Sequence, residues 1–352
     1  MTNLAISQKA LPSNKVMGSY LLKRLLTMIP TLFGITLITF AVVHLTPGDP
    51  AKLKIKMSEM GQSSPVTQEM IEQTRKLYGL DKPLHVQYGI WLKRLLKLDF
   101  GDSFKDGRPV MDKLKEHLPI TLILNAISIS LIYLIAVPLG VLSAIKRRSL
   151  VDNILTVILF ILYSLPSFFV ALMLIIFFAG GDVLDWFPAY GIHSEGAEEY
   201  GAILWVMDFA WHLVLPVTCL TYGGLAYLSR MSRIGMLDVI RQDYIRTARA
   251  KGLSEKVVIM KHAFRNSLIP IVTLMAGLLP AMLGGSVIIE KIFSIRGMGL
   301  LTFDAILSRD YPLIMGIFTL ASFLTLLGLL FSDILYALVD PRISFGELSS
   351  ES

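Results

Sequence analysis

The stretch DYIRTARAKGLSEKVVIMKHAFRNSLIP, residues 243–270, lies between two long apolar runs and carries many positive charges. Gly252 suits the left-handed residue that follows a helix, and Leu253 suits the hydrophobic contact that accompanies such a cap. Ser254 is a favoured N-cap for a second helix. The pattern therefore predicts a helix over residues 236–251, a sharp turn and a second helix. The basic residues of the stretch are Arg246, Arg249, Lys251, Lys256, Lys261 and Arg265.

The first of these helices is expected to be amphipathic, because Met236, Ile240, Tyr244 and Ala248 recur every four residues. Three interpretations compete for the unit. A DNA-binding helix-turn-helix is disfavoured, because a segment joined to apolar runs at both ends could hardly enter a major groove. A basic helix lying on anionic lipid is the second interpretation. The third, a docking element for a partner protein, also accounts for the rigid turn.

The composition of the whole chain favours a membrane protein. The chain has 352 residues, of which 54% are hydrophobic and only 17% are charged, so a soluble globule is disfavoured. The formal charge of +6 gathers in particular loops and does not imply nucleic-acid binding. The single cysteine, Cys219, excludes an intrachain disulfide and is expected to be a buried small hydrophobe.

Several apolar runs are long enough to cross a bilayer, since about 20 helical residues span a hydrocarbon core of roughly 30 Å. We therefore expect an all-α polytopic membrane protein with six transmembrane helices. The first run follows Lys23 and Arg24, but it is too long for a signal peptide and is expected to be a retained anchor. The runs cover residues 25–46, 119–145, 151–179, 208–229, 267–289 and 313–338.

The positive residues predict the orientation, because short cytoplasmic connections are enriched in Lys and Arg. They gather before the first run, after the second and after the fourth, whereas the connection between the third and fourth runs is acidic. Both ends, residues 1–24 and 339–352, are therefore expected in the cytoplasm, together with a connecting loop over residues 236–266. The residues that carry this argument are Lys9, Lys15, Lys23, Arg24, Lys146, Arg147 and Arg148, against Asp182, Asp185, Glu195, Glu198, Glu199 and Asp208.

Because successive connections alternate between the two sides of the membrane, residues 47–118 are expected on the outer side. This segment is too long to be a bare loop. We expect them to form a small helical cap, with one helix over residues 67–79 and another beginning at Pro83. A simple tether is the alternative. The stripe predicted for the first of these helices is Met70, Ile71, Thr74, Leu77 and Tyr78.

Short motifs in this order resemble the B permease subunits of oligopeptide and dipeptide ABC importers. They are PGDP (47–50), YGLDKPLHVQY (78–88), LDFGDSF (98–104), YIRTARAKGLSEK (244–256), KHAFRNSLIP (261–270), SRDYP (308–312) and VDPRI (339–343). The insertion FFAGG…FP..G after the third run further suggests the oligopeptide or microcin C branch. The general Glu-Ala-Ala of such importers is replaced here by Arg246, Thr247 and Ala248, so the surface groups that would meet the ATPase are in doubt.

The resemblance implies a type I ABC importer permease, with residues 119–338 as its transmembrane core. It implies as partners a homologous second permease, two ABC ATPase subunits, an extracytoplasmic peptide-binding protein and the lipid bilayer. It also implies a coupling loop that contacts the ATPases. The implied coupling residues are Tyr244, Thr247, Ala248, Arg249, Ala250, Lys251, Gly252, Leu253, Ser254, His262, Arg265 and Asn266.

The chain shows no catalytic motif of its own. A phosphate-binding loop needs a Gly-Lys pair, and no such pair occurs, so ATP and Mg²⁺ are expected on separate subunits and no cofactor on this chain. An intramembrane protease, suggested by GGD at 180–182, lacks the first Gly of its motif and a second Asp within a span. No HExxH or close His pair indicates a zinc site. Import of nickel or another small solute, and a receptor role, remain the alternatives.

The fifth apolar run is expected to bend, because it contains Pro270 and Pro280. Its small residues favour close helix packing, either along a substrate path or in a static bundle. Charged residues at the outer ends of the fifth and sixth runs could lie where cargo enters, or could be solvated rim charges. They are Lys291, Asp304, Arg309 and Asp310, and the candidate path residues are Pro280, Gly284, Gly285, Ser286 and Glu290.

Overall fold

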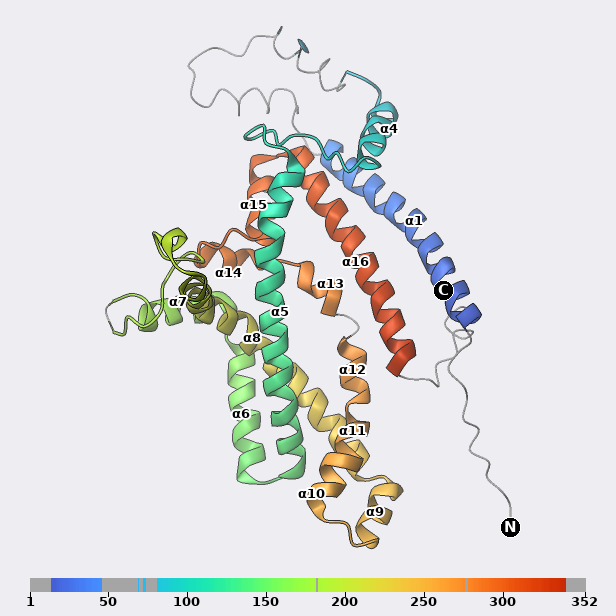
Figure 1. Cartoon of the computed structure of the whole chain (residues 1–352), viewed down its shortest axis with the longest axis vertical. Helices are drawn as coiled ribbons and strands as arrows, with labels where there is room; N and C mark the ends of the chain where they lie inside the picture. Colours follow the sequence, from blue (N-terminus) through green and yellow to red (C-terminus); the bar gives the residue numbers. More distant parts are fainter. Residues whose placement is uncertain are drawn as a thin grey trace.

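The computed structural model of the chain describes residues 14–45, 69, 72–73, 81–181, 183–275 and 278–339. The molecule is elongated, and one helix, α5 (Val110–Ile145), runs along most of its length (Figure 1). At the lower end in Figure 1 lie α9 (Asp243–Ala250) and α10 (Glu255–Val257) on either side of Gly252. We call this the Gly252 end. The opposite end carries α4 (Leu84–Leu95) and α15 (Met298–Ser308), and we call it the α15 end.

Four helices of the described chain are long and apolar enough to cross a membrane by themselves. Each corresponds to one predicted apolar run, and α1, α5 and α8 extend well beyond the run at one end or both. At about 1.5 Å per residue, the 36 residues of α5 extend for roughly 54 Å, which exceeds the hydrocarbon thickness. The four helices are α1 (Asn14–Leu45), α5, α8 (Ala202–Ile240) and α16 (Tyr311–Val339).

The third predicted span, residues 151–179, is not one straight helix. It consists of α6 (Leu150–Ser164) and α7 (Ser167–Phe178), whose axes differ by 98°. The break falls at Leu165, which is extended, as expected for the residue before a proline. Pro166 therefore ends the span that the apolar run alone suggested to be continuous.

The fifth predicted span is divided, as its prolines and glycines indicated. Residues 276–277 lie outside the described part, and residues 284–286 form no helix. Figure 1 shows these pieces rising from the Gly252 end toward the middle of the molecule. The pieces are α11 (Phe264–Ser267), α12 (Ile269–Met275), α13 (Leu278–Leu283) and α14 (Val287–Ile292).

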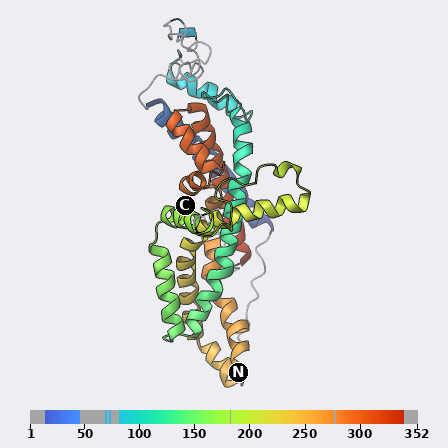
Figure 2. The same ribbon diagram turned by 90° about the vertical axis from the view of Figure 1, so that its left-hand side faces the viewer.

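Of the predicted cap, the part beginning at Pro83 is confirmed as helical, since α4 starts directly after that residue. The helix predicted over residues 67–79 falls mostly outside the described residues. The chain from residue 110 to 118, assigned by sequence to the cap, forms the first turns of α5 instead. Between α7 and α8, a short 3₁₀-helix (Ala197–Glu199) leads into the start of α8, which projects sideways from the middle of the molecule (Figures 1 and 2).

The helices α5 and α8 form the main packed pair of the described chain, and glycine brings them together. A Cβ atom built at Gly140 on α5 would lie 2.3 Å from the carbonyl oxygen of Ser229 on α8. The hydroxyl of Ser232 donates to the carbonyl of Val137 at 3.0 Å across the same crossing. Such close approach of small residues is the usual means of helix association in membranes.

Gly140→Val is therefore expected to force the two helices apart and to destabilise the fold by at least about 1–3 kcal/mol, the usual cost of overpacking. The measurement is the melting temperature of the detergent-purified protein. Gly223→Val on α8 is the matched control, because a Cβ there meets no atom within 4 Å. Equal melting temperatures for the two variants would contradict the packing described here.

Candidate functional site

The turn at Gly252 is a complete helix cap. Gly252 has φ +75°, the left-handed conformation that the sequence predicted. Its N–H donates to the carbonyl of Arg249 at 2.9 Å, and the N–H of Leu253 donates to the carbonyl of Ala248 at 3.4 Å. These two bonds define a Schellman motif, which satisfies the last carbonyls of α9. Ser254 occupies the N-cap position of α10, although its side chain makes no capping bond there.

The predicted helix over residues 236–251 is wrong in one respect, because Gln242 is extended and separates α8 from α9. This break rotates the apolar stripe. Ile245 and Ala248 are buried, whereas Tyr244, predicted on the stripe, is 43% exposed. Together with Met236 at the end of α8, these residues pack against Val141 and Ala144 of α5, and against Val258 and Ala263.

Polar contacts brace the two sides of the turn. The guanidinium of Arg249 donates to both carboxylate oxygens of Glu255, at 2.6 and 3.1 Å. This hydrogen bond lowers the pKa of the Glu255 carboxyl, so the pair stays charged at neutral pH. Asn266 donates to the hydroxyl of Tyr244 at 2.9 Å and to the carbonyl of His262 at 3.1 Å. Between Glu255 and Asn266 the chain forms one turn of π-helix (Val258–Ala263), a feature that is common at functional sites.

Most of the predicted coupling residues lie together on the surface of this unit. Ala248 is buried and His262 is half-buried. Two apolar side chains of the unit, Leu253 and Met260, are also exposed, at 41% and 55%. The exposed predicted residues are Tyr244, Thr247, Arg249, Ala250, Lys251, Gly252, Leu253, Ser254, Arg265 and Asn266.

A buried ion pair near the unit joins α6 to α8 and was not foreseen from the sequence. Asp152 is 4% exposed and accepts hydrogen bonds from Arg233 at 2.8 and 3.1 Å. It also accepts from the hydroxyl of Ser143 on α5 and from the N–H of Arg148. The sequence held one signal for this pair: Asp152 follows the N-cap residue Ser149 by three positions, and Arg233 lies near the end of another apolar run.

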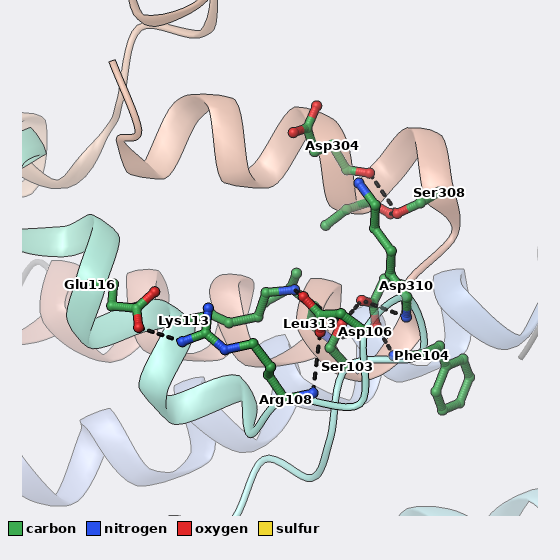
Figure 3. A network of polar contacts seen from close by, with 12 residues as sticks. Ser103, Phe104, Asp106, Arg108, Lys113, Glu116, Asp304, Ser308, Asp310 and Leu313 are labelled. Carbon is green, nitrogen blue, oxygen red and sulfur yellow. Dashed lines mark hydrogen bonds and ion pairs between the residues drawn. The ribbon is translucent and has the colours of Figure 1, made fainter. Parts of the chain in front are cut away.

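At the α15 end, a second polar network brings together two of the sequence motifs (Figure 3). Asp310 of SRDYP is fully buried and accepts the hydroxyl of Ser103, from LDFGDSF. It also accepts the N–H of Phe104 at 2.9 Å. The Lys113 ammonium, on α5, donates to Ser103 at 3.1 Å and to Asp106 at 2.7 Å. The expectation that Asp310 is a rim charge is therefore wrong, because it fastens the loop before α5 to the start of α16.

The residues predicted to line a substrate path lie in or near the break that follows α13. Asn125 of α5 donates to the carbonyls of Met282 and Gly284, at 2.8 and 3.0 Å, and so holds the broken end. Glu290 does not face an open path here: it is 2% exposed and accepts the N–H of Leu300 at 2.6 Å. A Cβ built at Gly285 would lie 2.5 Å from this carboxylate. Gly284, Gly285 and Ser286 lie in the break itself, and Pro280 lies in α13.

Long apolar helices around a broken central one, with a rigid helical turn at one end, are typical of a multi-pass helical membrane protein. Residues 136–345 match the family described as "Binding-protein-dependent transport system inner membrane component", and residues 17–125 match its N-terminal component. The chain belongs to this family of binding-protein-dependent transport permeases. The chain is therefore a multi-pass protein of the inner membrane. It is the transmembrane component of a transport system and belongs to a family whose members carry no ATPase domain.

Similar proteins span the same length. The oligopeptide transport system permease protein AppB of Bacillus subtilis is 39% identical, over 94% of this chain and 100% of the relative. The dipeptide transport system permease protein DppB of Alkalihalophilus pseudofirmus is 37% identical, over 94% and 100%. The inner membrane ABC transporter permease protein YejB of Escherichia coli O157:H7 is 36% identical, over 94% and 99%.

Proposed function

We propose that the chain is one of two permease subunits of an ATP-driven importer of short peptides. The observation that carries the coupling role is the capped turn at Gly252, because the helix before it, α9, packs on the two helices that form the main pair of the fold. Two ATPase subunits would bind ATP and Mg²⁺ and grip this turn in a groove. A peptide-binding protein would deliver cargo at the α15 end, and a homologous second permease would complete the pore.

This proposal places the Gly252 end, residues 1–24 and residues 339–352 in the cytoplasm. The distribution of basic residues supports it, because Lys146, Arg147 and Arg148 lie at the α5–α6 turn. The exposed groups around the turn, Tyr244, Leu253 and Met260, offer a helical surface with apolar anchors, the kind that docks in a groove. Movement of this surface would pass to α5 and α8 through Ile245 and Ala248.

The substrate is proposed from the relatives, two of which are named as oligopeptide and dipeptide permeases. Cells lacking this chain are expected to take up a labelled tripeptide at least tenfold more slowly than cells that contain it, while nickel uptake is unchanged. Restoring the chain should restore peptide uptake. Loss of nickel uptake alone would instead assign a metal cargo, and loss of neither would favour a receptor or enzyme.

A further inference from the structure

A cleft of about 440 Å³ opens between α6 and α8, and it runs from the level of Arg233 toward the end of α6. Thr156, Phe160 and Tyr163 line it from α6, and Tyr227, Arg230 and Arg233 line it from α8. Its volume falls within the range of about 300–1,000 Å³ that is common for small-molecule sites. The cleft is separate from the capped turn and from the break between α13 and α14.

The positive charges of this cleft are not balanced within the described chain. Arg233 is neutralised by Asp152. The two Asp152 oxygens already accept bonds from Ser143, the Arg148 N–H and two nitrogens of Arg233, and a carboxylate offers about four acceptor sites. Arg230 lies one turn along α8, is exposed, and makes no ion pair or hydrogen bond with the residues that the structure describes. The cleft therefore presents one cation that needs an anion.

The position of Arg230 along the helix indicates where that anion comes from. Arg233 meets Asp152, the third residue of α6, and Arg230 lies about 4.5 Å from Arg233 along α8, at 1.5 Å per residue, on the side away from the start of α6. Just beyond the start of α6, the turn carries Lys146, Arg147 and Arg148. Arg230 thus lies one turn deeper in the span than the Asp152–Arg233 pair, and its long side chain can carry the guanidinium back toward the basic surface, where lipid headgroups lie.

The side chains around the cleft are apolar enough to contact a lipid acyl chain. The outer face of α6 exposes aliphatic and aromatic side chains, including Ile154, Val157 and Phe160, at 56–69%. Tyr163 and Tyr227 line the cleft with rings that carry an apolar body and a polar hydroxyl. An uncompensated Arg beside such a surface is satisfied by a ligand that carries both a phosphate and an apolar tail. Basic pockets between spans are known to hold such headgroups.

We propose that this cleft binds one anionic phospholipid from the leaflet at the Gly252 end, with Arg230 donating to its phosphate and an acyl chain lying along Phe160 and Tyr163. The proposal does not depend on the identity of the cargo. Because the occupied cleft would fill the space between α6 and α8, the lipid would brace the pair that Asp152 and Arg233 already join.

The test is native mass spectrometry of the assembled transporter, purified with its co-expressed subunits. Dioleoyl phosphatidylglycerol and dioleoyl phosphatidylcholine are added at equal concentration. The wild type should retain phosphatidylglycerol at least fivefold more than phosphatidylcholine. Arg230→Gln should remove this preference, and Arg230→Lys should keep most of it. Arg241→Gln, which removes an exposed Arg outside the cleft at the end of α8, is the matched control and should behave as wild type.

Equal retention of the two lipids by the wild type, or an unchanged preference in Arg230→Gln, would overturn the proposal. Displacement of the bound phosphatidylglycerol by millimolar tripeptide would also overturn it, since the cleft would then belong to the cargo path. Retention that survives tripeptide and inorganic phosphate, and is lost only in Arg230→Gln, would support the assignment to a lipid.

Discussion

Gly252→Pro is expected to reduce ATP-driven peptide uptake at least tenfold while the protein still inserts and assembles in the membrane. Gly252 has φ +75°, whereas proline fixes φ near −65°, so the chain cannot keep the present turn. Proline also removes the N–H that donates to Arg249. The Schellman motif is lost, and a movement imposed at the tip would be absorbed by a loosened turn. The measurement is uptake of a labelled tripeptide together with ATP hydrolysis in the same vesicles.

Two further substitutions at Gly252 separate conformation from surface chemistry. Gly252→Asn should retain most of the uptake, because Asn tolerates the left-handed conformation through local hydrogen bonds. Gly252→Ala should be intermediate, since that conformation costs an ordinary residue about 1–2 kcal/mol. Normal uptake by Gly252→Pro, with hydrolysis still coupled, would show that the rigid turn has no part in transmission.

Asp310→Ala should produce the largest loss of stability among single changes at the α15 end. Asp310 is fully buried and accepts bonds from Ser103 and Phe104, while Ser103 in turn accepts from Lys113. Removing the carboxylate leaves several buried donors without an acceptor, each costing about 1–3 kcal/mol. We therefore expect a loss of at least about 3 kcal/mol, or roughly 5 °C or more in melting temperature for a chain of this size.

The matched control for this change is Asp304→Ala, which removes an exposed carboxylate on α15. It should leave the melting temperature almost unchanged. A double-mutant cycle between Asp310→Ala and Ser103→Ala should give strong coupling, because the two side chains share one network. Additive effects in that cycle would mean that the contact between the two motifs contributes little to stability.

Helix type and approximate span positions follow from the sequence, because apolar runs of spanning length have few alternatives. The cap at Gly252 was also predictable, since a left-handed residue after a helix strongly favours glycine. The buried state of Cys219 was predicted and is confirmed. These features depend on residues that are neighbours along the chain.

Other features were missed, either because a local break in a helix was overlooked or because the contact joins residues that are distant along the chain. Tyr244 was placed on the buried stripe because an uninterrupted helix was assumed, and the break at Gln242 rotates Ile245 into its place. Asp310 was taken for a rim charge because its partner Ser103 lies 207 positions earlier. Pro166 was the available signal for the 98° bend in the third span, and it was overlooked within a long apolar run.

The most direct test of the account is a crosslink from the tip of the capped turn. Leu253→Cys places a thiol at an exposed position, and the native Cys219 is buried, so within this chain a maleimide photo-crosslinker should label the new site alone. In vesicles actively importing peptide, the account predicts adducts between this position and an ATPase subunit. Adducts confined to lipid would contradict it.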